Sequence, residues 1–190
     1  MKAVPLSAAM AILAASCSGN SSAKPTPPTP DLRPIVDSAP YFCDLVPEGA
    51  FRRATGLTMK LSPRWSGPQT DNGLCLAFAA DREAPLGLNW SFNNGKNVID
   101  RQQRNGEDDS PHPLPPELGT GLAVIQPTAG ADPRPNYVIA LFKCGKRTPW
   151  IRIDFAPVVR GRDAVEDMVA FMRIAEKRFG QIHKCTPKPA

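Results

Sequence analysis

The sequence has little of the chemistry that most enzyme classes need. Its 190 residues include two histidines, His112 and His183, and contain neither a G-x-S-x-G nor an H-E-x-x-H motif. A serine hydrolase needs a histidine base beside its nucleophile, and a zinc protease of the H-E-x-x-H type needs two histidine ligands. A glycine-rich loop that could cradle phosphates is absent too. We therefore expect a protein that is not an enzyme and that needs neither a cofactor nor a metal ion.

Long hydrophobic runs are also absent. The apolar stretch at the N-terminus, Ala3 to Ala15, is about 13 residues long, whereas a membrane-spanning helix needs about 20. Lys2 precedes this stretch and supplies the positive charge with which secretory signals begin. The stretch is therefore typical of an export signal.

The residues around Cys17 resemble a bacterial lipobox, a signal in which lipid is attached to the cysteine and the preceding residues are cut off. Ala15 and Ser16 are small, as the motif requires, although Ala14 stands where leucine is usual. The alternative is an ordinary cut after Ser16, which would give a secreted protein. We predict a signal peptide over residues 1–16 and a lipidated Cys17, which anchors the chain to membrane lipid on the outer face of the cell membrane.

The net charge of +5 is unevenly distributed, because residues 143–190 hold 11 Lys/Arg against 5 Asp/Glu. Such a basic third suits either an ordinary solvated surface or a face turned toward anionic headgroups or an acidic wall polymer. No basic run is interleaved with aromatic residues, and an exported chain does not meet nucleic acid. We therefore expect no nucleic-acid partner.

Four cysteines remain once Cys17 is assigned to lipid, and outside the membrane cysteines usually pair. They allow three connectivities. We favour Cys43–Cys75 and Cys144–Cys185, because each pair lies within one half of the chain. A thioredoxin-type C-x-x-C motif is absent, and the spacings do not fit zinc fingers.

Proline positions divide the chain into a spacer and a domain. Residues 17–40 are rich in proline and serine and predict an extended tether behind the lipid. A single disulfide-stapled domain follows over residues 41–186, with residues 187–190 as a tail. Residues 62–73 read as a loop because of their Pro, Gly, Asn and Asp content.

Periodicity within the domain predicts an α+β fold. Its mainly antiparallel sheet should have five or six strands, covered by a C-terminal helix and a short N-terminal helix. Residue Asp163 with Glu166 resembles a capping box at the start of the last helix, and Gly180 suits the position just beyond its end. The predicted elements are a helix starting at Pro47, strands at Leu74–Ala80, Leu86–Phe92, Gly121–Gln126, Tyr137–Cys144 and Trp150–Phe155, and the helix after Asp163.

Residues 93–119 are polar and then proline-rich, and they read as the least structured interior segment. Glu107, Asp108 and Asp109 lie near His112, but they lack the ligand spacing of a calcium loop. We interpret the segment as an exposed charged loop. An enzyme that used these carboxylates would need them to converge in a cleft.

Two short patterns resemble a known group of proteins. Cys43-Asp44-Leu45-Val46-Pro47 opens a helix that ends at Thr55-Gly56, and Gly73-Leu74-Cys75 enters a strand. With the lipobox and the tether, these residues are similar to actinobacterial secreted lipoproteins grouped as a domain of unknown function. The resemblance implies an anchored extracytoplasmic α+β domain and brings no known activity.

Two functions fit these features. The first is a membrane-anchored, non-enzymatic binding or adaptor module that meets a protein partner in the cell envelope. The alternative is a carrier of a small ligand or lipid, with an apolar pocket between sheet and helix lined by Met168, Met172 and the strand of Trp90. A packed interior with an exposed apolar patch would favour the adaptor.

Overall fold

The computed structural model describes residues 29–81, 83–105, 111–126 and 132–190. Cys17 and the predicted signal peptide lie outside these residues, as does the cluster Glu107–Asp109. The main elements in chain order are β1 (Tyr41–Phe42), β2 (Val46–Pro47), α1 (Glu48–Thr55), β3 (Ser62–Ser66), β4 (Asn72–Phe78), β5 (Leu86–Ser91), α2 (Gly95–Asn105), β6 (Pro111–Pro113), the 3-10 turn η1 (Pro116–Leu118), β7 (Thr120–Val124), β8 (Asn136–Cys144), β9 (Trp150–Phe155), α3 (Ala164–His183) and β10 (Pro187–Pro189).

The fold is α+β, with a mainly antiparallel sheet as predicted, but the strand count differs. The main sheet has eight strands in the order β3-β4-β5-β9-β8-β7-β6, with β10 paired to the end of β8. The hairpin of β8 and β9 lies at its centre, as its alternating sequence predicts. The separate pair β1 and β2 forms a two-stranded sheet.

The strands of the main sheet that were not predicted from the sequence are β3, β6 and β10, and the short β1 and β2 were not predicted either. Each of the three main-sheet strands contains proline: Pro63 in β3, Pro111 and Pro113 in β6, and Pro187 and Pro189 in β10. Proline cannot donate a hydrogen bond within a sheet, so a pattern containing it argues against a strand except at an edge. β3 and β6 are the two ends of the strand order. The loop predicted over residues 62–73 therefore holds an edge strand, and the tail predicted over 187–190 holds β10.

The segment predicted as a structureless loop, residues 93–119, contains α2, β6 and η1. Helix α2 has few apolar residues. Among them, Ile99 is fully buried. With Leu122, Val124, Ile139 and others, Ile99 forms a small second core between α2 and the sheet. One apolar turn is too short to give a helical period, which is why the pattern was missed.

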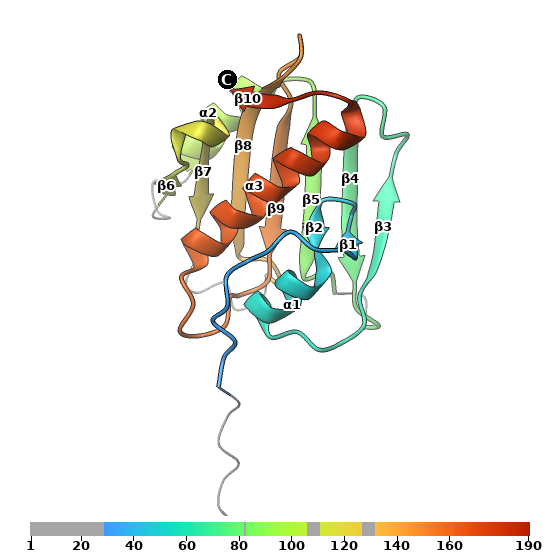
Figure 1. Cartoon of the computed structure of the whole chain (residues 1–190), viewed down its shortest axis with the longest axis vertical. Helices are drawn as coiled ribbons and strands as arrows, with labels where there is room; N and C mark the ends of the chain where they lie inside the picture. The colour runs from blue at the N-terminus through green and yellow to red at the C-terminus, as the bar shows by residue number, and fades with distance from the viewer. Residues whose placement is uncertain (1–28, 82, 106–110, 127–131) are drawn as a thin grey trace, which may run out of the picture.

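The main core lies between the sheet and α3, which crosses its front face, with α1 at the lower end (Figure 1). The predicted capping box of α3 is confirmed, since the Asp163 side chain accepts a hydrogen bond from the Glu166 backbone N–H. The helix runs past Gly180, however, and ends at His183. A Cβ on Gly180 would stand 2.6 Å from the Cys185 backbone oxygen, so the glycine permits a close contact and does not end the helix.

Both predicted disulfides are present. Cys43 bonds Cys75, with their Cα atoms 5.9 Å apart, and Cys144 bonds Cys185, with their Cα atoms 5.3 Å apart. The first joins the small β1–β2 sheet to β4, and the second joins the chain beyond α3 to β8. Because the core and both disulfides lie within residues 29–190, a chain that begins at Ser18 keeps all of them.

Glu176 is a buried carboxyl on α3, with only 4% of its surface exposed. Its Oε1 atom accepts no hydrogen bond from any described residue. Burial raises the pKa of Glu176 to about 8, although Arg173 nearby opposes the shift. The folded state therefore holds this proton more tightly than the unfolded chain does, whose glutamate pKa is about 4.3.

We predict that Glu176 makes the protein less stable as pH rises. Its contribution is intact below the unfolded pKa and is lost as pH rises through about 8, with a slope of up to about 1.4 kcal/mol per pH unit. Glu176→Gln should raise the free energy of unfolding at pH 9 by about 2–4 kcal/mol and change it little at pH 5. Urea unfolding at both pH values measures this, with Glu166→Gln, an exposed glutamate of the same helix, as the control. Equal effects of Glu176→Gln at both pH values would contradict the burial argument.

Candidate functional site

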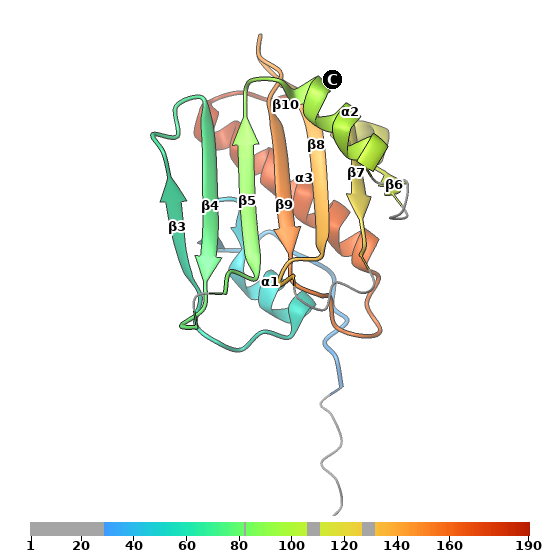
Figure 2. The same cartoon turned by 180° about the vertical axis from the view of Figure 1, so that it is seen from behind.

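One face of the sheet is covered for only part of its width. Helix α2 packs over β7 and β8, and Figure 2 shows that no helix of the described chain covers β3, β4 and β5 on that side. We call this uncovered region the open sheet face. Its side chains alternate with those of the main core, as the strand repeat of two dictates. Two rows of directly paired residues cross it: Arg64, Leu76, Gly87, Asp154 and Tyr137 in one, and Ser66, Leu74, Asn89 and Arg152 in the other.

An ion pair on β9 borders the open sheet face next to β5. Arg152 binds Asp154 at 2.7 Å, and the two side chains are 27% and 21% exposed. The Arg152 guanidinium also lies 3.9 Å from the centre of the Tyr137 ring, and the Tyr137 hydroxyl donates to Gln102 of α2 at 3.0 Å. Desolvation raises the pKa of Asp154, and Arg152 opposes the shift. These contacts fix the guanidinium in place while leaving part of it open to a ligand.

Gly87 leaves room for a second arginine beside this pair. A Cβ at Gly87 would stand 2.8 Å from the Arg134 Nη1 atom, 3.3 Å from the Asp154 Oδ2 atom and 3.4 Å from Leu76. The Arg134 guanidinium therefore lies against the backbone of Gly87. Any larger residue at position 87 would displace the Arg134 guanidinium. Glycine at this position therefore allows the positive charge of Arg134 to lie beside Asp154.

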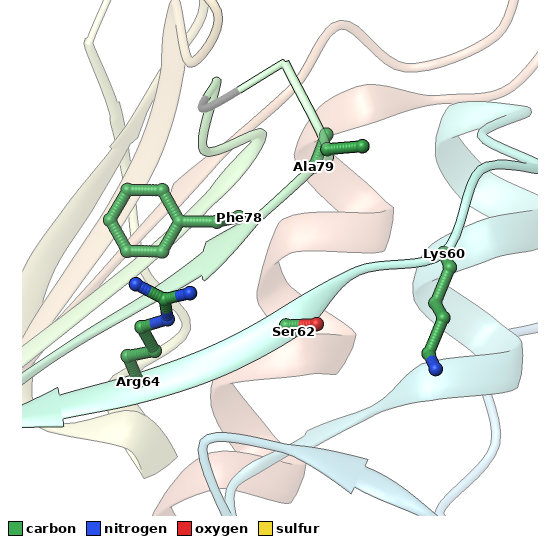
Figure 3. Close-up of a pocket in the computed structure, with 6 residues that line it drawn as sticks. Lys60, Ser62, Arg64, Phe78 and Ala79 are labelled. Carbon is green, nitrogen blue, oxygen red and sulfur yellow. The ribbon is translucent and has the colours of Figure 1, made fainter.

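The outer edge of the open sheet face has a hollow of about 590 Å³ beside β3. Arg64 lies over the Phe78 ring, with its guanidinium carbon 5.6 Å from the ring centre. Figure 3 shows these two side chains facing each other, with Lys60 on the far side of Ser62. Leu74, which is 42% exposed, lies on the next strand. The face thus combines apolar side chains with arginines that can bind carboxylates or stack on rings.

The groups needed for hydrolysis or metal binding do not gather here. Within the described residues no three His, Cys, Asp or Glu side chains come close enough to hold a metal ion. His112 lies exposed on β6. His183 packs among aromatic rings, 4.1 Å from the Phe179 ring and 4.9 Å from the Trp90 ring. Desolvation lowers the pKa of His183, with a smaller effect from Arg147.

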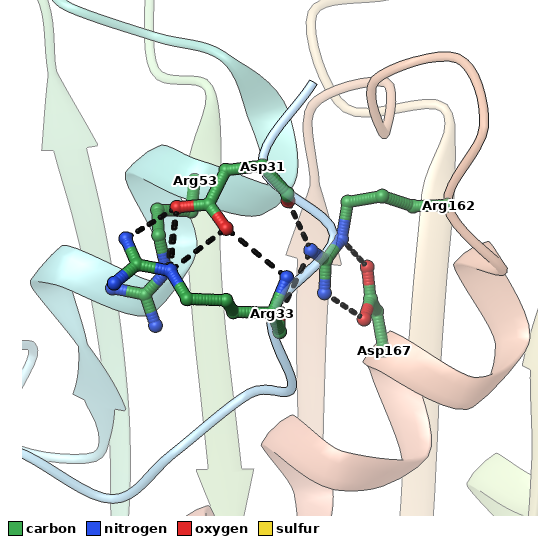
Figure 4. Close-up of polar contacts among 5 residues, drawn as sticks. All are labelled: Asp31, Arg33, Arg53, Arg162 and Asp167. Carbon is green, nitrogen blue, oxygen red and sulfur yellow. Dashed lines mark hydrogen bonds and ion pairs between the residues drawn. The ribbon is translucent and has the colours of Figure 1, made fainter. Parts of the chain in front are cut away.

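The last part of the segment predicted as an extended tether packs onto the domain from Asp31 onward. Arg162 forms two hydrogen bonds of 2.6 Å with Asp167 at the start of α3, and both side chains are more than nine-tenths buried. The Arg162 Nη1 atom also donates to the backbone oxygens of Asp31 and Arg33, at 2.5 and 3.0 Å. Figure 4 shows Arg162 between the incoming segment and the helix. We call this arrangement the N-terminal clamp. Residues 17–28 of the predicted tether lie outside the described residues.

Weaker contacts extend the clamp in both directions. Asp31 binds Arg33 at 2.6 Å and lies 3.7 Å from Arg53. The Arg33 hydrogen bonds hold the pKa of Asp31 well below its usual range. Further along, Asp37 binds Lys177 of α3 at 2.7 Å. Together these contacts hold residues 31–37 against the domain.

Comparisons with known proteins identify no relative, so the function is inferred from this geometry. No protein-family model matches the chain, and no curated protein or solved structure matches it significantly. Within the described residues, no helix is both long and apolar enough to cross a membrane.

The clamp predicts an unequal response to two mutations. Arg162→Ala leaves the Asp167 carboxylate buried without its partner, so it should lower the free energy of unfolding by about 3–5 kcal/mol. It should also speed thermolysin cleavage before Leu32, because the segment loses its hold on α3. Lys177→Ala, which removes a pair whose lysine is 61% exposed, should cost less than about 1 kcal/mol. Denaturant unfolding and timed digestion measure both effects. An unchanged cleavage rate in Arg162→Ala would show that Arg162 does not hold the segment.

Proposed function

We propose that this protein is a membrane-anchored extracytoplasmic lipoprotein that acts as a non-enzymatic adaptor and binds a protein of the cell envelope through the open sheet face. One observation carries the proposal: partly exposed Leu74, Leu76 and Phe78 stand on an uncovered sheet beside Arg64 and Arg152. Protein interfaces typically have such an apolar centre, enriched in aromatic residues and arginine.

The breadth of the face supports a protein partner over a small ligand. Neighbouring strands lie about 4.8 Å apart, so the face from β3 to β9 is about 15 Å wide. Small-molecule sites enclose most of their ligand, whereas the hollow on this face is lined only by β3, the end of β4 and the residues next to them. Isolated exposed leucines are common, but three apolar side chains that follow one another on one face of β4, with arginines on either side, indicate an interaction site.

The interior argues against the carrier alternative in the form that the sequence suggested. Met168, Met172 and Trp90 are 1%, 0% and 3% exposed and belong to the main core cluster. They pack against the sheet and helix residues between which the ligand pocket was expected. A ligand would have to displace close-packed side chains, which is costly.

The anchor rests on the lipobox and on the resemblance to actinobacterial lipoproteins. Between Cys17 and the first described residue, Thr29, lie 11 residues, which reach about 40 Å when extended. A lipidated Cys17 would thus keep the domain close to the membrane while leaving the open sheet face accessible. Two acyl chains hold a protein at a membrane far more stably than one.

Cross-linking in the native envelope tests the proposal. A photoreactive residue at Leu76 of the full-length chain should give one discrete adduct with another protein, and Arg64→Glu should weaken it. The same probe at Ile182, which is 48% exposed near the end of α3, should not give that adduct. The same adducts from both positions, or an adduct that is lipid, would contradict the assignment.

In a parallel strain, Cys17→Ala should release the chain from the membrane fraction or stall its processing. A normally cut, membrane-bound variant would reject the anchor alone.

A further inference from the structure

A second surface feature lies where the N-terminal segment meets the domain. A groove of about 880 Å³ opens between residues 29–31, the end of α1 and the loop before α3. Pro30, Leu57 and Val159 give it apolar walls, and Arg52, Arg53 and Arg160 also line it. We call it the basal groove. Its location differs from the open sheet face, which lies on the opposite side of the sheet from α1.

The charge of the basal groove is not balanced by its own lining. Arg52 is paired with Glu48 at 2.7 Å. Arg53 and Arg160 therefore share the one lining carboxylate, Asp31, which also binds Arg33. The Arg53 Nε atom is buried, donates no hydrogen bond within the described residues and lies 3.7 Å from Asp31, while the Arg53 side chain as a whole is 25% exposed. Arg160 is exposed and forms no ion pair in the described part of the chain. The groove therefore offers guanidinium donors that an anion could engage, and arginine matches phosphate oxygens with two parallel hydrogen bonds.

Apolar side chains project from the same segments. Leu32 and Met59 are 58% and 45% exposed, and each lies one residue beyond a stretch that lines the groove. A water-exposed apolar residue beside a cationic groove is typical of a surface that inserts shallowly into lipid headgroups. An acidic peptide would account for the arginines but would leave these two side chains unexplained.

The path of the chain supplies the third argument. Thr29 lines the basal groove and stands 12 positions after Cys17. The N-terminal clamp holds the first described residues against the domain, so the groove lies where the described chain begins, beside α1 and the loop before α3. This step rests on the proposed lipid anchor. An anchored domain whose near end carries arginines and apolar residues would meet the headgroup layer directly.

We propose that the basal groove docks on the surface of the anchoring membrane and binds the phosphate of an anionic phospholipid through Arg53 and Arg160. Leu32 and Met59 enter the headgroup layer beside it. Docking holds the domain in one orientation. In that orientation the open sheet face points sideways, parallel to the membrane surface. It adds a second attachment to the lipidated cysteine.

Vesicle binding tests this without the anchor. The chain from Ser18 to Ala190 is sedimented with vesicles of phosphatidylcholine alone and of phosphatidylcholine mixed with phosphatidylglycerol. It should bind the mixed vesicles and not the neutral ones. Arg160→Glu should weaken binding about tenfold, and Met59→Ser should weaken it without altering the net charge. Lys146→Glu makes the same charge change in the β8–β9 turn at the far end of the domain and should have less than about a twofold effect.

Each other outcome overturns the proposal. Equal losses in Arg160→Glu and Lys146→Glu would indicate diffuse attraction by the net charge. Displacement by dissolved glycerol phosphate at low concentration would indicate a site for a free phosphate compound. No binding to mixed vesicles would remove the lipid assignment. Because the chain lacks Cys17, none of these results depends on lipidation or on the envelope partner, so either proposal can fail alone.

Discussion

The one-sided burial of the sheet by α3 determines the rest of this structure. Met168, Phe171, Met172 and Phe179 bury one side of the helix against the front of the sheet, where they exclude water from the main core. Among the described residues, α2 is the helix on the back of the sheet, where it covers β7 and β8. The back of β3, β4 and β5 is consequently left without a helical layer. A two-layer domain with a partly uncovered sheet has a surface suited to a third layer, which a partner can supply.

The two ends of the molecule take different roles under this account. Arg162 ties the incoming N-terminal segment to the start of α3, so this segment and the core helix are held together. At the opposite end, the bond between Cys144 and Cys185 ties the exit of α3 to β8. A helix fixed at both ends holds the end of the domain that carries the basal groove in a set orientation relative to the sheet. The basal groove and the open sheet face can thus act together, one holding the domain and the other presenting a binding surface.

The sequence predicted the elements whose stability is local and missed those that depend on neighbours. Helix α3, the β8–β9 hairpin and the disulfides follow from capping, alternation and cysteine placement. β3, β6 and β10 do not, because their prolines are tolerated only at the sheet positions that the fold gives them. The sequence shows that Trp150, Arg152 and Asp154 alternate with apolar residues, but it does not show which of the three a helix covers. These three side chains point to the same face of β9. Trp150 lies under α2 and Arg152 does not, and the sequence of β9 alone does not say where α2 packs. The N-terminal clamp was equally hidden, since Arg162 and Asp31 are 131 residues apart in sequence.

The central claim is that the open sheet face is covered by another protein in the envelope. Hydroxyl-radical footprinting of the same chain in intact cells and after purification tests it most directly. The account predicts that Leu74, Leu76 and Phe78 are modified in the purified protein and protected in cells, while Ile182 is modified equally in both. Equal modification of the three sheet residues in cells and in purified protein would contradict the claim, because a face in contact with a partner cannot remain open to solvent.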